Sequence, residues 1–480
     1  METINNYING KLTATKPENF MESFEPATGK AYAKLPISQT ADLDQAVEAA
    51  AQAFESWSGL SPETRSGWLL KIADSLEHYQ EQLASAESKD TGKPVSLARE
   101  LDIPRAVANF KFFANAILHT SSQVHHTNTA VLNYTNRTPV GIAGCISPWN
   151  LPLYLLSWKI APALAAGNTV VAKPSEITPM SAFLLSRICI EAGLPPGVLN
   201  IIHGPGQPTG QMVVAHPQIP LISFTGGTDT GRQIAVTAAP MFKKLSLEMG
   251  GKNPNIIFDD CDLQLALEGT VRSSFTNQGQ ICLCGSKVFI QEGIYDRFKK
   301  ALVANSARLQ PADPQEPDTV MGALVSKQHM EKVLGYIELA KKEGGTVLTG
   351  GQRIKLKGRC VDGNFVLPTI IEGLANSCRV NREEIFGPVI TLIPFKDEQD
   401  VITMANAVDY GLSASIWTRD LGRAHSVAAL LKSGVVWVNC WLVRDLRTPF
   451  GGMKQSGVGR EGGEEALRFF TEAQNVCIKL

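Results

Sequence analysis

The chain has no apolar run close to the ~20 residues that a membrane-spanning helix needs. Its N-terminus, METINNYINGKLTATKPENF, lacks the charged and then apolar pattern of a secretory signal. It also lacks an excess of either charge, because 45 basic residues stand against 46 acidic ones. Neither a basic surface for nucleic acid nor an acidic tail is therefore expected. We predict a cytoplasmic protein with no membrane and no nucleic acid among its partners.

Disulfide and zinc frameworks are missing as well. The nine cysteines are odd in number and scattered, which does not fit a disulfide scaffold. No CxxC or HxxxH spacing occurs, so we expect no metal site. Most of these thiols are expected to fill the core, as free cysteines commonly do.

The chain does have an ordinary globular composition and a length that predicts two or three domains. Its 480 residues, 44% hydrophobic and 19% charged, exceed the usual ~100–200 residues of one domain. Residues 40–120 have helical periodicity, whereas 121–139 are polar and β-prone, as in a projecting arm. Strands and helices alternate over 140–247 and again over about 248–435, which indicates parallel α/β sheets. We assign 61–92 to one helix and KKLSLEMGG to the second sheet.

The motif FTNQGQICLCGS, residues 275–286, contains Cys282 just after Gly279 and Gln280. A glycine turn there can expose a thiol together with a backbone N–H, and a nucleophilic thiolate needs an accessible polar setting. By itself, a cysteine in such a position is more often buried and structural, and Cys284 keeps that interpretation.

Two further motifs place a carboxylate and an amide at strand ends. In KKLSLEMGGKNPNIIF, Glu248 ends an apolar strand before a glycine pair, where it can activate water. The alternative is an ordinary surface glutamate. In SPWNLPL, Asn150 lies at a strand-to-helix turn, where its amide can donate to an oxyanion. The alternative is a helix N-cap, which favours asparagine.

Three other motifs suit a dinucleotide. VVAKPSE places Lys173 and Glu176 on the loop after a strand, where a ribose or phosphate lies in doubly wound folds. In FTGGTDTG, Gly226 and Gly227 open a helix whose N-terminus suits a pyrophosphate. Because this is not GxGxxG, it is weak support by itself. EEIFGPV adds Glu384 beside a Gly-Pro turn.

Together these motifs resemble the aldehyde dehydrogenase superfamily. SPWNLPL, AKPSE, FTGG, LEMGGK, NQGQICL, EEIFGPV and PFGGMKQSGVGRE occur in the order that the family has, over almost the whole chain. The resemblance implies an α/β fold with a Rossmann-like nucleotide-binding domain at 1–120 and 140–247 and an α/β catalytic domain at 248–435. It also implies a small β oligomerisation arm and C-terminal segment, at 121–139 and 436–480, that builds a homodimer or homotetramer.

The family's roles can be carried over residue by residue. Cys282 would attack the aldehyde, Asn150 and the Cys282 backbone N–H would hold the oxyanion, and Glu248 would activate the water that releases an acid. The residues implied to bind the cofactor are Trp149, Lys173, Glu176, Gly226, Gly227 and Glu384. NAD is the expected cofactor because the charge of Glu176 would repel a 2′-phosphate. Lys173 beside it leaves NADP possible.

Two stretches, DIPRAVANFKFF and NCWLVRDLRTPFGG, resemble the aminomuconate and hydroxymuconate semialdehyde dehydrogenases. The resemblance implies that Arg105 and Arg444 bind a substrate carboxylate, with Arg447 nearby as a further candidate. A guanidinium suits this task because its planar fork meets a carboxylate with two hydrogen bonds. The alternative is an ordinary surface ion pair, such as Arg444 with Asp445. We predict a carboxylate-bearing substrate such as 2-aminomuconic or 2-hydroxymuconic semialdehyde.

Four alternatives remain open on the sequence. They are a broad-specificity dehydrogenase of neutral aldehydes, including retinal-like ones, a CoA-acylating dehydrogenase, a cysteine hydrolase, and a non-catalytic relative. The presence of Glu248 argues against CoA acylation, because that branch typically lacks this base. The absence of a histidine from the cysteine motif disfavours a hydrolase. Cys282, Glu248 and Asn150 are all intact, which argues against a non-catalytic relative.

Overall fold

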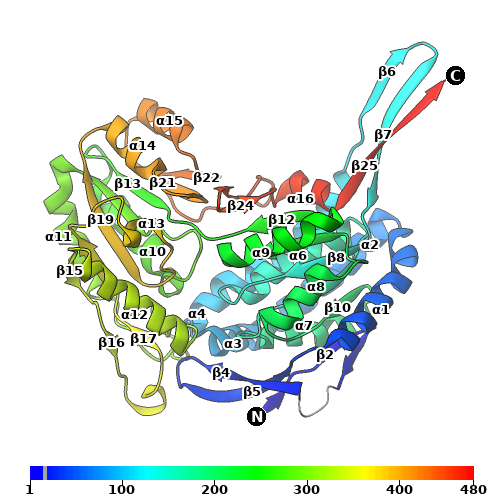
Figure 1. Ribbon diagram of the computed structural model, residues 1–480, viewed down its shortest axis with the longest axis horizontal. Coiled ribbons are helices and arrows are strands. Elements are labelled where there is room, and N and C mark those ends of the chain that lie inside the picture. The colour runs from blue at the N-terminus through cyan, green and yellow to red at the C-terminus, as the bar shows by residue number, and fades with distance from the viewer. Residues whose placement is uncertain (15–18, 480) are drawn as a thin grey trace.

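The computed structural model describes residues 1–14 and 19–479, and two large sheets dominate it (Figure 1). The first sheet has eight strands in the order β24-β12-β11-β8-β9-β10-β2-β3. Its five central strands are parallel, and an antiparallel segment is added at each edge. The strands are β2 (Asn6–Ile8), β3 (Lys11–Thr13), β8 (Ile142–Ile146), β9 (Thr169–Lys173), β10 (Leu199–Ile201), β11 (Leu221–Thr225), β12 (Lys244–Glu248) and β24 (Gly457–Val458).

Helices cover both faces of this sheet, which is why its central strands are largely buried. Because side chains alternate along a strand, Ala143 and Cys145 pack into the cluster that contains α6, whereas Ile142 and Ile146 pack with α1. The covering helices include α1 (Thr40–Ser58), α2 (Pro62–His78), α3 (Gln80–Thr91), α5 (Ile103–Ala116), α6 (Pro152–Ala165), α7 (Met180–Glu191), α8 (Gln211–Ala215) and α9 (Thr228–Ala238).

The prediction of one helix over 61–92 is wrong, because the chain breaks at Tyr79 into α2 and α3. Tyr79 leaves the helical conformation, and its hydroxyl donates to Glu191, 2.8 Å away on α7. A contact so far along the chain leaves no local signal. The predicted end at Gly92 is confirmed, since Gly92 caps α3 at a φ of +78°.

The second sheet has seven strands in the order β15-β18-β19-β14-β13-β21-β22, parallel except for β15. They are β13 (Pro254–Ile257), β14 (Lys287–Gln291), β15 (Thr346–Thr349), β18 (Thr369–Glu372), β19 (Val389–Phe395), β21 (Ser413–Trp417) and β22 (Val435–Val438). The helices α10 (Leu263–Phe275), α11 (Tyr295–Ser306), α12 (Lys327–Lys342), α14 (Glu398–Asn406) and α15 (Leu421–Leu430) accompany it.

The assignment of KKLSLEMGG to the second sheet is wrong. Strand β12 pairs in parallel with β11 along its whole length and therefore belongs to the first sheet. The short helix α9 returns the chain beside the strand it has just left, as right-handed crossovers do. The chain passes to the second sheet only after the glycine pair that follows Glu248.

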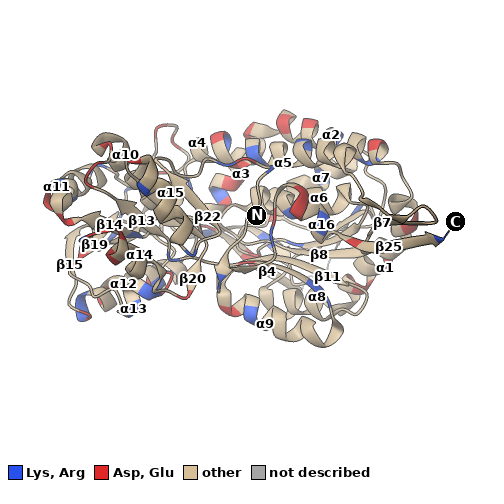
Figure 2. Cartoon of the chain, turned by 90° about the horizontal axis from the view of Figure 1, so that it is seen from above, with Lys and Arg blue, Asp and Glu red and all other residues tan. Residues whose placement is uncertain are grey.

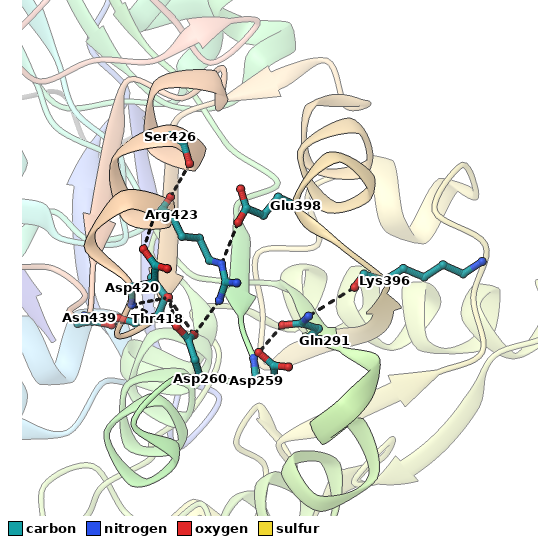
Figure 3. A network of polar contacts seen from close by, with 10 residues as sticks. All are labelled: Asp259, Asp260, Gln291, Lys396, Glu398, Thr418, Asp420, Arg423, Ser426 and Asn439. Atoms are coloured by element: carbon teal, nitrogen blue, oxygen red, sulfur yellow. Dashed lines mark hydrogen bonds and ion pairs between the residues drawn. The ribbon is translucent and has the colours of Figure 1, made fainter.

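Side chains fill the carboxyl edge of the second sheet, as Figure 3 shows. Asp260, which follows β13, accepts a hydrogen bond from the Thr418 hydroxyl at 2.9 Å, and Arg423 lies 3.1 Å from it. Arg423 also donates to Glu398 at 2.9 Å. In open α/β sheets this edge commonly binds ligands. In this protein, these ion pairs and hydrogen bonds fill the carboxyl edge of the second sheet, so a ligand is expected at the carboxyl edge of the first sheet.

Three antiparallel strands form an arm that projects from the body at the upper right of Figure 1. They are β6 (Val124–Asn128), β7 (Val131–Pro139) and β25 (Thr471–Lys479), and every residue of β6 is exposed. Acidic and basic residues are interspersed over the rest of the molecule, as Figure 2 shows. Among the described residues, no helix is both long and apolar enough to cross a bilayer.

Candidate active site

A cleft of about 720 Å³ opens at the carboxyl edge of the first sheet. Lys173 ends β9, and its ammonium lies 3.0 Å from the carboxylate of Glu176. Both residues line the cleft, together with Trp149, Gly226 and Gly227. The structure thus brings five of the six residues predicted to bind the cofactor to one surface.

The glycine turn at the start of α9 is shaped to receive a phosphate. A Cβ on Gly226 would lie 2.4 Å from the ring of Phe224, so a side chain there would collide. A Cβ on Gly227, the N-cap of α9, would meet nothing within 4 Å. The first turn of the helix therefore presents its N–H groups beside open space, which suits a pyrophosphate.

A second cavity, of about 230 Å³, continues this cleft toward the other sheet. The two share Trp149, Gly226 and Gly227, and the second adds the predicted site residues Asn150, Cys282 and Glu384. A ligand lying along the cleft would therefore extend from Lys173 at one end to the cysteine at the other. In this conformation, Glu384 accepts a hydrogen bond from the Gly251 N–H at 3.0 Å.

Hydrogen bonds hold both the side-chain amide and the backbone carbonyl of Asn150. Its side-chain Nδ2 donates to the Gln280 carbonyl at 3.0 Å, just ahead of Cys282. Its own carbonyl accepts from Lys93 Nζ at 3.0 Å and from Asn277 Nδ2 at 3.1 Å. The alternative of a helix N-cap is wrong, because Leu151 is the N-cap of α6 and no side chain in the described part of the chain caps that helix.

Cys282 follows a strained turn. Asn277, Gln278 and Gly279 all have positive φ, at 52°, 56° and 69°, and a Cβ on Gly279 would lie 2.2 Å from the Gly387 carbonyl oxygen. Such a conformation is costly for residues other than glycine and persists only where surrounding contacts impose it. The turn leaves Cys282 half-buried in the cavity wall, whereas Cys284 is only 6% exposed and packs in the core.

The electrostatics around the thiol disfavour its charged form. Burial raises the pKa of Cys282, and the negative charges of Glu384 and Glu248 raise it further. The positive charge of Arg444 acts in the opposite direction. The thiol therefore rests protonated at neutral pH and has to lose its proton to become a nucleophile.

Glu248 ends β12 and is only 3% exposed, so the alternative of a surface glutamate is wrong. Neither of its carboxylate oxygens has a hydrogen-bond partner among the described residues. Burial raises its pKa, and the nearby charge of Glu461 raises it further. The carboxylate lies against the backbone of Gly451, where a Cβ would be 2.8 Å from Oε1. It is adjacent to the cavity without lining it, because its neighbours Met249 and Gly250 form the wall.

A histidine does lie in this cavity, although the sequence shows none near the cysteine motif. His329 of α12 is part of its lining, and its Nε2 lies 2.6 Å from the Phe386 carbonyl. Its ring meets Trp149 edge-on at 5.0 Å between centroids. Burial lowers its pKa to about 4. Among the described residues, the side-chain hydrogen bond of this ring goes to that carbonyl and not to Cys282, so the histidine does not form a Cys–His pair in this conformation.

A third cavity, of about 810 Å³, contains the predicted arginines. The guanidinium carbons of Arg105 and Arg444 each lie 5.9 Å from the ring of Trp158. Arg105 has two buried nitrogens without a partner, and Arg444 makes no ion pair with any residue that the structure describes. Asp445 pairs with Arg447 at 2.6 Å instead, so the alternative of an Arg444–Asp445 pair is wrong.

Comparison with known proteins decides the family. The model of the aldehyde dehydrogenase family matches residues 12–476. The chain belongs to the aldehyde dehydrogenase family. It is 51% identical to the 2-aminomuconic semialdehyde dehydrogenase of Danio rerio, over 99% of this chain and 98% of the relative. It is 44% identical to the 2-hydroxymuconic semialdehyde dehydrogenase of Pseudomonas sp. strain CF600, over the full length of both.

A solved aldehyde dehydrogenase confirms the predicted α/β fold. The NAD+ complex of the enzyme from Bacillus cereus superimposes with a TM-score of 0.97 at 40% identity, covering 100% of this chain and 97% of that one. The match covers the whole chain and therefore includes both large sheets and the arm.

Sequence reasoning missed several residues that shape this aldehyde dehydrogenase site. Lys93 and Asn277 hold the carbonyl of Asn150, and the buried pair Lys159–Glu461, at 2.8 Å, lies close enough to affect the pKa of Glu248. Asn277 is part of the quoted cysteine motif, so its position was a usable signal. The others come from segments far along the chain and carry no local pattern.

Proposed function

We propose that this chain oxidises a carboxylate-bearing aldehyde to the acid with NAD, using Cys282 as nucleophile. The observation that carries the proposal is one continuous cleft that joins the Lys173–Glu176 end to Cys282 and Asn150. Arg444 supports the substrate class, because it lacks an ion-pair partner among the described residues yet lies close enough to oppose the raised pKa of Cys282. A panel of aldehydes with and without a distal carboxylate, assayed with NAD, tests it.

The cleft fits a dinucleotide in three places. Glu176 would accept from an adenosine ribose, the open N-terminus of α9 would hold the pyrophosphate, and Glu384 would meet the nicotinamide ribose. NAD bound in this cleft would supply the hydride acceptor for the oxidation. The Bacillus cereus relative was solved in complex with NAD+.

The chain's own residues supply the remaining chemistry. The Cys282 thiol gives its proton to water, and its sulfur adds to the aldehyde carbon. Asn150 Nδ2 together with the Cys282 N–H donates to the oxygen that becomes negative. After hydride leaves the carbon, the acyl group remains on sulfur as a thioester. Glu248 takes a proton from water, the water oxygen attacks the acyl carbon, and the acid leaves while the sulfur is regenerated.

The arginines set the substrate class. Two guanidiniums that share one aromatic wall and lack carboxylate partners among the described residues would bind a substrate carboxylate with charge-assisted hydrogen bonds. We therefore assign a semialdehyde of the muconic type, in agreement with the names of the Danio rerio and Pseudomonas relatives.

We expect Arg444→Ala to raise the KM for a carboxylate-bearing semialdehyde by roughly 10- to 100-fold, because a hydrogen bond to a charged group contributes ~1.5–3 kcal/mol. The KM for a neutral aldehyde such as hexanal should change less than threefold. Arg447, the further candidate from the sequence, is exposed and already paired with Asp445 at 2.6 Å, so Arg447→Ala is the matched control. An equal rise for both aldehyde classes would remove the carboxylate role.

Glu176→Gln should narrow the preference for NAD over NADP. The carboxylate beside Lys173 repels a 2′-phosphate, and removing ~1 kcal/mol of like-charge repulsion raises kcat/KM for NADP roughly fivefold. The value for NAD should fall, because the amide is a weaker acceptor for the ribose hydroxyls. The comparison requires both cofactors at a saturating aldehyde concentration. An unchanged ratio of the two kcat/KM values contradicts the assignment.

We also propose that the arm builds a homodimer or homotetramer. Strands β6 and β25 lie at the two edges of its sheet, and their side chains are mostly exposed in the single chain. Unpaired strand edges are templates for pairing with another chain, which is a reason to expect partners there. Light scattering at micromolar concentration would establish the assembly.

A further inference from the structure

Three charged side chains lie fully buried beneath the candidate site. Glu87, Lys93 and Asp102 are all 0% exposed. The ammonium of Lys93 donates to Asp102 and, at 3.0 Å, to the carbonyl of Asn150. Glu87 accepts from the Leu153 N–H at 2.8 Å, at the start of α6. Two of the three groups thus bind the backbone that carries the Asn150 amide into the cavity.

The turn that carries Lys93 is fixed by the other half of the molecule. Gly92, in the left-handed region, is pressed against Ala323, whose carbonyl oxygen would lie 2.8 Å from an added Cβ. Ala323 N–H donates back to the Gly92 carbonyl at 2.8 Å. Gln278, in the turn before Cys282, donates to the Ala323 carbonyl at 2.8 Å. The position of Lys93 is therefore fixed relative to the turn that precedes Cys282.

The Asn150 carbonyl receives donors from both sides of the cleft. Lys93 reaches it from the first half and Asn277 from the turn before Cys282, at 3.0 and 3.1 Å. Fixing that carbonyl fixes the orientation of the residue, and hence the direction in which Nδ2 leaves the backbone. Without Lys93, Asn277 would be the only side chain among the described residues that holds the carbonyl.

Stability is a poor explanation for this arrangement. A buried ion pair gains little over apolar side chains of the same volume, because both ions lose their hydration. Burial raises the pKa of both Asp102 and Glu87, which shows how unfavourable the surroundings are for charge. A cation retained there, donating to the backbone of a residue in the cavity wall, is better explained by the orientation it imposes.

We propose that Lys93 is a positioning residue that aims the Asn150 amide at the oxyanion formed on the substrate carbonyl. The inference rests on the proposed role of Asn150 and adds the residue on which its geometry depends. Lys93 lines neither the cleft nor the smaller cavity that contains Cys282, so its effect should appear in kcat and depend on the presence of Asn150.

A double-mutant cycle in the full-length enzyme tests this inference. The variant Lys93→Met/Asp102→Leu removes both charges, so that neither is left uncompensated. We expect its kcat to fall about tenfold or more, with the KM values for NAD and aldehyde within twofold of the unaltered enzyme. Asn150→Ala alone should lower kcat about 100-fold. Adding the Lys93 and Asp102 changes to Asn150→Ala should cost less than a further twofold.

Two further variants separate orientation from stability. Lys93→Arg keeps a cationic donor, so it should lose less activity than the methionine variant and again add nothing to Asn150→Ala. It also completes the cycle if the apolar pair does not fold. Arg65→Met is the matched control, because Arg65 is a buried cation that donates to the Ala165 carbonyl at 3.0 Å, at the opposite end of α6. It should lower the Tm and leave kcat unchanged.

The outcomes are distinguishable. Equal losses of kcat with and without Asn150 would overturn the positioning role, as would a change confined to KM or a similar loss of kcat in Arg65→Met. An Asn150→Ala enzyme with full activity would instead refute the proposed oxyanion role, whatever Lys93 does.

Discussion

Replacing Cys282 with alanine is expected to reduce NAD-dependent aldehyde oxidation to background, with the fold intact. The cysteine lines the cavity that continues the nucleotide cleft, and no other thiol is part of that lining among the described residues. Removing the nucleophile removes the covalent step, which general binding in the cleft does not replace. Reduced nicotinamide absorbance measures the rate, and circular dichroism checks the fold.

Cys284→Ala is the matched control for this result. It lies two residues away, but it is buried in an apolar cluster and makes no part of the cavity wall. We expect some loss of stability, because a small buried side chain has been shortened, with turnover close to that of the unaltered enzyme. An inactive Cys284→Ala enzyme together with an active Cys282→Ala enzyme would show that the nucleophile is not Cys282.

The pH dependence of thiol alkylation follows from the same surroundings. Burial, Glu384 and Glu248 raise the pKa of Cys282, so the unreactive neutral thiol predominates up to a pH above the ordinary thiol range. The rate of alkylation by iodoacetamide in the free enzyme should therefore keep rising with pH beyond the range in which a free cysteine levels off.

Glu248→Gln is expected to stop the reaction after the first half. The glutamine cannot take a proton from water, so steady-state turnover should fall ~10²- to 10⁴-fold, the usual contribution of a general base. In the proposed mechanism, the first acylation does not use this carboxylate. A burst of reduced nicotinamide equal to the number of active sites should therefore remain in rapid-mixing measurements.

The raised pKa of Glu248 determines the direction in which the rate of acid release changes with pH. Burial and the charge of Glu461 favour the protonated carboxyl, and only the charged form can accept a proton. The rate of acid release should therefore rise with pH, with a midpoint above that of an ordinary carboxyl group. Glu461→Gln removes one negative charge and should move that midpoint down. A Glu248→Gln enzyme without a burst would place the carboxylate in the first half-reaction instead.

The residues whose position depends on local strand ends were predictable from the sequence. Lys173 ends β9, and Gly227 is the N-cap of α9. Parallel strands align their carboxyl ends, so these residues lie at one edge of the sheet regardless of the conformation of the loops. Glu248, at the end of β12, was found for the same reason, although its strand was assigned to the wrong sheet.

Orientation and long-range support were not predictable in the same way. Lys93 lies 57 positions before the residue whose carbonyl it holds, and nothing in its own segment indicates that contact. Asn277 and Gln278 adopt positive φ, which their residue types do not demand and which only the surrounding contacts impose. At Tyr79, where the predicted helix breaks, the hydroxyl reaches Glu191 on another helix, a contact that its own segment does not indicate either.

The central claim is that Cys282 carries the acyl group of the substrate. The most direct measurement is mass spectrometry of the Glu248→Gln enzyme, mixed with NAD and a carboxylate-bearing semialdehyde and digested at acidic pH. The account predicts one acyl group per chain, on the peptide that contains Cys282. An unmodified Cys282 peptide after a burst of reduced nicotinamide, or an acyl group on another residue, would contradict it.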